Sequence, residues 1–519
     1  MRDTEAPGAG RQGGAGDGPS TISSRGLARA ATFLRVRYGS VEAPARLVVF
    51  LFVVVSMLAL TVSIILTPPG QVPDAPAQFD RAVEVSQGGF VGLVRGGKSG
   101  DFLPTGVGRF EEAFGPLIFN AAAKVTRSEF DRATHSVWGR RRQFVAFGGT
   151  TQYPPLAYLP GALAVWIARS LSTRVVVAYY LLEFFNAIAF VSLVAWALAL
   201  FRGVASSLLA AVALLPMMVA LAGSPSTDGI IVGLAAVFAG ILYRRLDGNH
   251  AHGAGRSEIV SSPRRGLAGW VPELSWLEWI ALCALGVVVL AKPAYFPLVL
   301  AMGLVQARQR NLLGYLQRVV PLGLLLGVAL ACWYRLGARI QGAYAVAGPS
   351  VSPVRQLKFI LAHPGSTAHV ASATLRLDSN FYWHSFVGIL GWLDTPLESW
   401  LYLGVIVGLG VLLAIRLVTG KRDWATLICC AAVVIFSAAL IFIALYLDWS
   451  PVGSRVVVGV QGRYFLPLAP VIILALGVDR PRVAWGALWW RLSAAVWLAM
   501  ACLAVAGASA ALVGRYWLT

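Results

Sequence analysis

The chain has 519 residues, of which 57% are apolar and only 13% charged, and its mean hydropathy is +0.69. Soluble domains carry about 25% charged residues, so this composition excludes an ordinary soluble protein and predicts a polytopic membrane protein. The formal net charge of +19 would indicate nucleic-acid binding in a soluble chain. Here the arginines flank apolar runs, and no basic patch interleaved with aromatic residues stands apart from them. We therefore expect a lipid bilayer, and no nucleic acid, as a partner.

The N-terminal residues 1–24 are rich in Gly, Ser and Ala and have no apolar periodicity. This predicts a disordered cytoplasmic tail. No apolar core occurs within the first thirty residues, so the segment does not resemble a signal peptide. We expect the rest, 25–519, to form a single membrane domain. The first apolar run has no small-residue cleavage site after it and should stay in the mature protein.

Apolar runs long enough to cross a bilayer recur along the chain, and they predict an all-α protein with about eleven transmembrane helices. The predicted spans are 46–66, 175–201, 204–222, 227–244, 274–291, 293–307, 319–335, 398–416, 424–447, 464–478 and 487–513. A further run, 155–171, is ambiguous because it opens with two prolines and carries Arg169. Counting it as a span would reverse the side of everything downstream.

The distribution of basic residues decides this choice. Arg25, Arg29, Arg35 and Arg37 precede the first span and predict a cytoplasmic N-terminus. If 155–171 lies at the membrane surface, the basic clusters at 244–265, 308–318, 416–422 and 480–482 all become cytoplasmic. If it crosses, all four face outward. The positive-inside rule therefore favours an interfacial or re-entrant 155–171, about eleven spans, and an outer C-terminus.

This topology leaves three sizeable outer segments, 67–174, 336–397 and 448–463. The first is a long outer loop in which we expect interfacial helices. In the second, 354–361 and 367–377 mix apolar and polar residues at helical spacing, which is typical of helices that lie on a membrane surface. No internal repeat is evident, which argues against an inverted-repeat transporter.

The first outer segment begins with prolines that stop the helix and hold Asp74 just beyond the membrane surface. Asp80 and Arg81 follow in a segment predicted to be a surface helix. A carboxylate at this depth suits a general base that takes a proton from an acceptor hydroxyl, and Asp74 and Asp80 are the catalytic candidates. The alternative for Asp74 is an N-cap of the helix that starts near Pro76.

Arg463 lies at the outer mouth of a predicted span, within Gln461-Gly462-Arg463-Tyr464. Guanidinium suits phosphate binding because it is always charged and binds in a bidentate manner. The alternative is an interface anchor, with Tyr464 in the aromatic belt. Gly462 leaves room for close backbone approach, which favours a functional role. We therefore include Gln461, Arg463 and Tyr464 among the substrate-binding candidates.

Other polar residues end spans at the same face. Lys292 separates two short apolar runs, and a charged residue there is either functional or snorkels to the interface. Asp228 and Asp394 flank spans, where each is either a helix cap or a substrate contact. Tyr153, in a Tyr-Pro-Pro-Leu motif, and Arg81 complete the substrate-binding candidates.

The sequence has no GxxxxGK[ST], no GxGxxG after a strand and no HExxH. Its six histidines show no ligand pairing except His250-x-His252, in a predicted cytoplasmic loop. We therefore expect no nucleotide cofactor and no tightly built metal site.

These motifs, in this order, resemble a bacterial family of predicted membrane proteins of unknown function that is grouped with the GT-C-fold glycosyltransferases. The resemblance runs from about Pro68 to Pro470 and rests on PPGQVPDAPAQFDRAVEVSQGG, YPPLAYLPGAL, LLPMMVALAGSPSTDG, AKPAYFPLVL, GWLDTPL and GVQGRYFLP. It implies a GT-C-like membrane domain, transfer from a polyprenyl-phosphate-linked sugar, inversion at the sugar carbon and a base at Asp74. The family commonly has Asp-Glu-Pro and then Ala-His here. In this chain Ala75 and Gln78 replace the Glu and the His, which puts any metal-assisted version in doubt.

The expected function is a glycosyltransferase of the bacterial inner membrane, with its active site on the extracytoplasmic side and an envelope glycan or lipid as acceptor. One alternative is a glycan polymerase or ligase that acts on lipid-linked sugars. Another is a flippase or transporter of such lipids, which would need ionisable residues in the middle of several spans.

Overall fold

The computed structural model describes residues 42–251, 274–338, 340, 350–419, 423–476 and 486–518. The chain divides into two units, 1–44 and 45–519, and the fold below is that of the second unit. The predicted disordered tail, 1–24, lies outside the described residues.

The structure is mostly helical, with two small sheets. In chain order its first part comprises α2 (Glu42–Leu66), α3 (Ala75–Ser86), β1 (Leu93–Arg95), β2 (Lys98–Pro104), α4 (Thr105–Phe114), η1 (Gly115–Leu117), α5 (Arg127–Thr134), β3 (Arg142–Ala146), α6 (Gly148–Thr151), η2 (Pro155–Tyr158), α7 (Leu159–Ser170), α8 (Val175–Leu200), α9 (Val204–Ala213), α10 (Pro216–Ala222) and α11 (Asp228–Ala251). The remainder comprises α12 (Trp276–Ala291), η3 (Pro293–Gly303), α13 (Leu304–Arg308), α14 (Leu312–Leu336), α16 (Pro353–Ala362), α17 (Pro364–Val387), β4 (Ile389–Leu390), β5 (Thr395–Pro396), α18 (Ser399–Thr419), α19 (Trp424–Asp448), η4 (Gly462–Leu468), α20 (Ala469–Ala475) and α21 (Gly486–Tyr516).

Seven described helices are long and apolar enough to cross a membrane, namely α2, α8, α11, α14, α18, α19 and α21. The pair α9 and α10 makes an eighth candidate that is bent by 65° at its break. A polytopic membrane protein is thus confirmed, but the count of eleven spans is not. The predicted runs 274–291 and 464–478 form only short helices, and 293–307 is largely a 3₁₀ helix with Pro297 inside it.

The ambiguous run 155–171 forms η2 and α7. Twelve residues of α-helix extend about 18 Å, well short of the roughly 30 Å hydrocarbon core. The segment is not among the helices long and apolar enough to cross a membrane, and its interfacial or re-entrant position stays a prediction.

The mostly helical structure agrees with the predicted all-α class, and residues 67–174 also contain a small sheet that the sequence did not predict. Strands β1, β2 and β3 form an antiparallel sheet in that order. The predicted surface segments 354–361 and 367–377 do form helices, α16 and α17, although α17 extends to Val387.

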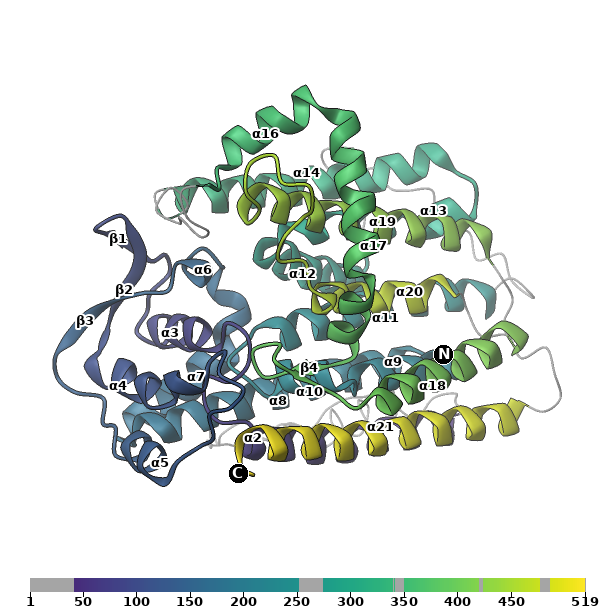
Figure 1. The fold of residues 1–519 in the computed structure, drawn as a ribbon. Helices are drawn as coiled ribbons and strands as arrows, with labels where there is room; N and C mark the ends of the chain where they lie inside the picture. Colours follow the sequence, from purple (N-terminus) through teal and green to yellow (C-terminus); the bar gives the residue numbers. More distant parts are fainter. Residues whose placement is uncertain are drawn as a thin grey trace, which may run out of the picture. The chain divides into compact units, whose positions relative to one another are not determined.

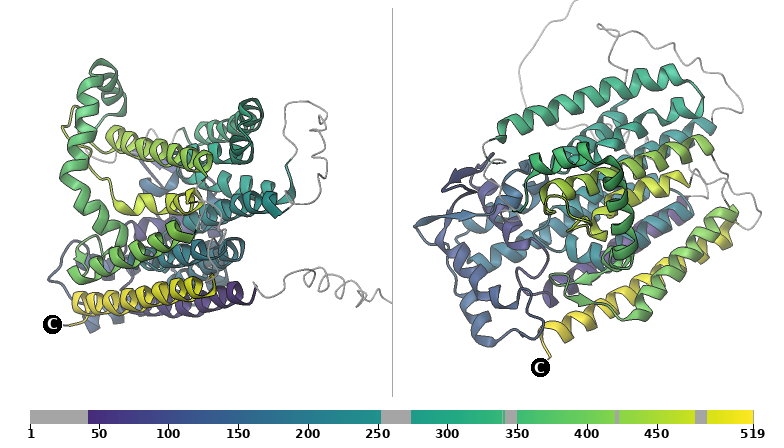
Figure 2. Two further views of the ribbon diagram at one scale, coloured as in Figure 1. Left: turned by 90° about the vertical axis from the view of Figure 1, so that its right-hand side faces the viewer. Right: turned by 45° about the horizontal axis from the view of Figure 1, so that its top comes forward.

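The long helices run together, and the elements of 67–174 gather at one end of them (Figure 1). The C-terminus of α21 lies beside these elements. There the Arg515 guanidinium donates hydrogen bonds to the carbonyl oxygens of Leu117, Asn120 and Ala123. Figure 2 shows α17 lying crosswise to α19, with α2 beside α21. The centre is α11: 83% of its most apolar stretch is buried, against 22% for α14 and α19.

The junction of η4 with α17 depends on a glycine. A Cβ on Gly462 would lie 1.9 Å from the Tyr382 carbonyl oxygen and 2.4 Å from the Phe386 nitrogen. The Gly462 N–H also donates to Ser385 Oγ at 2.8 Å. Only a residue without a side chain fits here, so Gly462 fixes η4 against α17.

We expect Gly462→Ala to destabilise the protein by about 1–3 kcal/mol or more, because the new methyl group meets backbone atoms that cannot rotate away. Thermal unfolding of the purified protein in detergent measures this. Gly410→Ala is the matched control: a Cβ there meets nothing within 4 Å, and the helix should become slightly more stable. Equal melting temperatures for Gly462→Ala and the wild type would contradict the packing argument.

Candidate functional site

Asp74 is held in an unusual backbone conformation at the start of α3. Its φ is 65°, a left-handed value that costs a residue other than glycine on the order of 1 kcal/mol. It occupies the N-cap position, but its side chain makes no capping hydrogen bond. The carboxylate instead accepts from Arg463 Nη2 at 2.8 Å, and the side chain is 56% exposed. The cap alternative therefore describes the position of Asp74 and not the role of its carboxylate.

Arg463 brings a buried positive charge to this point. It lies in the first turn of η4, and only 4% of its side chain is exposed. Its Nε donates to Gln461 Oε1 at 2.6 Å, and its guanidinium lies 5.3 Å from the centre of the Tyr464 ring. An interface anchor would extend its charged end into water, so this burial does not fit the anchor alternative.

A second ion pair lies near the same ring. Lys292, between α12 and η3, pairs through Nζ with the carboxylate of Asp228 at the start of α11. Both side chains are largely buried, and Lys292 Nζ lies 5.6 Å from the centre of the Tyr464 ring. The backbone of Tyr464 is fixed by the Tyr295 hydroxyl, which donates to its carbonyl oxygen at 2.8 Å. Tyr464 therefore contacts both cations.

The structure thus brings six of the ten predicted site residues together. We call them the Asp74–Arg463 cluster: Asp74, Asp228, Lys292, Gln461, Arg463 and Tyr464. It contains two carboxylates and two cations, so its formal charge is zero. Only Asp74 has a side chain that is more than half exposed.

Asp80 lies outside this cluster. Its side chain is buried, and Oδ1 has no hydrogen-bond partner among the residues that the structure describes. Burial, and next the charge of Glu84, raises the pKa of the Asp80 carboxyl to about 8. Burial and the charge of Asp80 likewise raise the pKa of Glu111. Asp80 is therefore a protonated interior group at neutral pH.

Arg81 and Tyr153 contact each other. Arg81 is fully buried, pairs with Glu84 at 2.6 Å, and donates to the Tyr153 carbonyl oxygen at 2.8 Å. These contacts join α3 to the loop before η2. Asp394 accepts from Arg515 Nη2 at 3.0 Å, which ties the β4–β5 turn to the end of α21.

Sequence reasoning missed Tyr158 and Gln78. The buried Tyr158 hydroxyl donates to Gln78 Oε1 at 2.6 Å, and the Tyr158 ring lies 5.9 Å from the Arg81 guanidinium carbon. One feature of the sequence could have indicated Tyr158: it follows Pro154 and Pro155 closely, in a segment without clear hydrophobic periodicity.

The arrangement offers an exposed carboxylate that can accept a proton and a buried guanidinium that can bind an anion. Among the described parts of the chain, no group of three or more His, Cys, Asp or Glu residues is placed to hold a metal ion.

A family model described as "Predicted membrane protein (DUF2142)" matches residues 57–472, a range that contains the whole cluster. No curated protein and no solved structure matches the chain significantly.

The raised pKa of Asp80 predicts a pH-dependent stability. The folded protein binds this proton more tightly than the unfolded chain, whose pKa is the ordinary 3.8, so stability should fall as pH rises from about 4 to about 8. Asp80→Asn should reduce that slope by up to about 1.4 kcal/mol per pH unit. Melting temperatures between pH 5 and 8 measure it, with Asp131→Asn, at an exposed residue, as the control. Identical slopes for Asp80→Asn and the wild type would show that Asp80 is ionised in the folded protein.

Proposed function

Since this chain belongs to the DUF2142 family of predicted membrane proteins, we propose a function for the cluster that the family region contains. The Asp74–Arg463 cluster is the active site of a membrane-embedded, GT-C-type glycosyltransferase. It moves a sugar from a polyprenyl-phosphate donor to an envelope glycan or lipid acceptor. The reaction takes place on the extracytoplasmic face of the bacterial inner membrane.

The observation that carries this proposal is the contact between an exposed carboxylate and a buried guanidinium. Arg463 is 4% exposed while its partner Asp74 is 56% exposed. A ligand phosphate can therefore reach Arg463 by replacing an exposed side chain, without opening the core. In the second pair both side chains, Lys292 and Asp228, are largely buried, and their opposite charges neutralise each other.

In this mechanism the donor phosphate takes the place of the Asp74 carboxylate on Arg463. The released carboxylate accepts the proton of the acceptor hydroxyl as that oxygen attacks the anomeric carbon. The bond between this carbon and the phosphate oxygen breaks, and polyprenyl phosphate leaves with its charge held by Arg463. Attack from the side opposite to the leaving group inverts the configuration at the sugar carbon.

Two other functions use the same residues differently. A polymerase or ligase would transfer a whole lipid-linked glycan, with the same base and the same cation. A flippase or transporter of lipid-linked sugars would need a polar path through the bilayer. The cluster favours transfer, because its residues come from the ends of helices: Asp228 starts α11, Lys292 follows α12, and Arg463 lies in the first turn of η4.

Asp74→Asn should lower sugar transfer by about 10²–10⁴-fold, because the amide cannot accept the hydroxyl proton. The amide oxygen can still accept the hydrogen bond from Arg463, and the melting temperature of the variant measures the effect of losing the counter-charge. Transfer is measured with purified protein and a labelled polyprenyl-phosphate sugar. Asp80→Asn tests the other catalytic candidate, and Glu112→Gln, at an exposed carboxylate, is the control. If only Asp80→Asn is inactive, the base is Asp80. If both variants are active, Asp74 is not a base and the enzyme proposal loses its main support.

Arg463→Lys should lower donor use by about two orders of magnitude, because lysine keeps the charge but cannot make the same bidentate contact in a buried position. Donor affinity and the transfer rate, measured separately, identify the step that is affected. Wild-type values for both would remove Arg463 from the site and make Lys292 the better phosphate ligand.

A further inference from the structure

A basic patch lies at the C-terminal end of α7. Arg169 is in the last turn of this helix, and its guanidinium carbon lies 5.2 Å from the centre of the Trp138 ring. The indole is fixed in turn, because Trp138 Nε1 donates to the Thr173 carbonyl oxygen at 2.9 Å. Residues 140–142 are all arginines, and all three are exposed. We call these five residues the Trp138–Arg169 patch: Trp138, Arg140, Arg141, Arg142 and Arg169.

Backbone contacts hold the turn that carries the three consecutive arginines. The Gly106 N–H donates to the Trp138 carbonyl oxygen at 2.9 Å, and the Thr105 N–H donates to the Arg141 carbonyl oxygen at 3.1 Å. A Cβ on Gly106 would lie 1.8 Å from the Val137 carbonyl oxygen, so the turn packs directly on the backbone at the start of α4. The guanidinium groups therefore extend from a fixed backbone, and a ligand that binds them does not have to order the loop first.

None of the four arginines of the patch forms an ion pair with a residue that the structure describes. Burial, and next the positive charge of Arg142, lowers the pKa of the Arg169 guanidinium. Two like charges near each other repel, and an anion between them removes that repulsion. The positive-inside rule does not account for these arginines, because the predicted topology places 67–174 outside.

An exposed apolar face of α7 leads to the patch. The opposite face of the helix packs on the span α8, where a Cβ on Gly161 would lie 2.9 Å from Leu182 Cγ, and the two helices lie side by side (Figure 1). Leu159, Leu163 and Trp166 share one side of α7, because they follow one another at helical spacing, and all three are exposed. An apolar face beside a spanning helix suits contact with lipid acyl chains.

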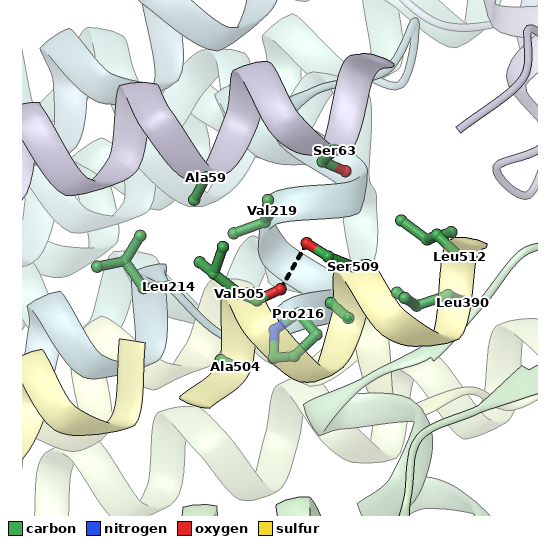
Figure 3. Close-up of a pocket in the computed structure, with 11 residues that line it drawn as sticks. Ala59, Ser63, Leu214, Pro216, Val219, Leu390, Ala504, Val505, Ser509 and Leu512 are labelled. Carbon is green, nitrogen blue, oxygen red and sulfur yellow. Dashed lines mark hydrogen bonds between the residues drawn. The ribbon is translucent and has the colours of Figure 1, made fainter. Parts of the chain in front are cut away.

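The space between α2 and α21 is, by comparison, too small for a lipid (Figure 3). Its volume is about 20 Å³, which is room for about one water molecule. The dashed line in Figure 3 joins Ser509 Oγ to the Val505 carbonyl oxygen of the same helix, at 2.7 Å. A lipid has no seat in this space, whereas the exposed face of α7 is open to one.

We propose that the Trp138–Arg169 patch binds the head group of an anionic phospholipid whose acyl chains lie along the exposed face of α7. The phosphate binds between Arg142 and Arg169, because a guanidinium matches phosphate in a bidentate manner. Arg140 and Arg141 add attraction to an anionic membrane surface. Trp138 lies at the boundary between head group and hydrocarbon, where tryptophan is enriched.

The apolar face favours a phospholipid over a soluble anionic glycan, because a glycan has no apolar part to place on Leu159, Leu163 and Trp166. The proposal does not depend on the proposed function, since no residue of the Asp74–Arg463 cluster belongs to the patch.

Native mass spectrometry of the purified full-length protein measures the retention of two probes, phosphatidylglycerol and phosphatidylcholine with the same acyl chains. The patch variant carries Arg142→Gln and Arg169→Gln. The control carries Arg335→Gln and Arg376→Gln, which remove the same number of positive charges from exposed positions on α14 and α17. Melting temperatures show whether each variant is folded.

We expect the patch variant to retain phosphatidylglycerol about tenfold less than the wild type, with the control within about twofold of the wild type. Retention of phosphatidylcholine should be the same in all three proteins. Equal retention of phosphatidylglycerol by the patch variant and the control would overturn the proposal, as would equal retention of the two lipids by the wild type. If the patch variant fails to fold, Arg140→Gln with Arg141→Gln replaces it, and a loss smaller than that of the control would then overturn the proposal.

Two further measurements locate and identify the ligand. Phosphatidylglycerol with a photoreactive acyl chain should cross-link to the exposed face of α7, and cross-links confined to other helices would contradict the proposal. A polygalacturonate fragment tests the glycan alternative. Its binding by the wild type and loss in the patch variant, with phosphatidylglycerol retention unchanged, would assign the patch to a glycan and overturn the phospholipid proposal.

Arg463→Lys separates the patch from the proposed active site. This variant should retain phosphatidylglycerol as the wild type does, whatever its rate of sugar transfer. A loss as large as that of the patch variant would place the bound lipid at the Asp74–Arg463 cluster and remove the patch as its site.

Discussion

The polar end of this fold depends on the neutralisation of one buried arginine. A guanidinium that is 4% exposed needs a counter-charge, because an unpaired buried ion is strongly unfavourable. Asp74 supplies that charge from 389 positions away in the sequence. The close packing of Gly462 on α17 and the hydrogen bond from Tyr295 to Tyr464 then fix the backbone on either side of Arg463. These contacts bring together the loop that contains Asp74, the 3₁₀ helix η4 and the helix α17.

The two ion pairs of the cluster differ in whether a ligand can replace one of their members. Lys292 and Asp228 come from segments packed in the helical core, and both are largely buried. Asp74 belongs to a loop, is more than half exposed, and carries a left-handed backbone conformation that packing and the Arg463 contact maintain. One pair therefore acts as a fixed frame for the Tyr464 ring, and the other has a member that a ligand can replace.

The sequence was sufficient to predict the long apolar spans and the polar residues at their ends, since composition and charge control both. It was not sufficient for the sheet, because Lys98–Pro104 and Arg142–Ala146 are short and mix polar with apolar residues, and pairing between distant strands decides their structure. Nor did it distinguish Asp74 from Asp80. Asp80 follows Asp74 by six residues, which on a helix corresponds to a rotation of about 240°. Asp80 therefore points into the interior although it is close to Asp74 in the sequence. The short run 293–307 failed as an ordinary span because Pro297 favours 3₁₀ geometry there.

The contacts of Arg515 have a consequence for how the molecule is made. Its guanidinium donates hydrogen bonds to backbone carbonyl oxygens of a loop that lies 392 to 398 positions earlier in the chain. During synthesis that loop leaves the ribosome long before the arginine does. The early loop must therefore wait, with its carbonyl groups hydrated, until the last helix has been inserted. The same delay applies to Asp74, whose partner also emerges late. The polar end can therefore be completed only after η4 and α21 have been synthesised.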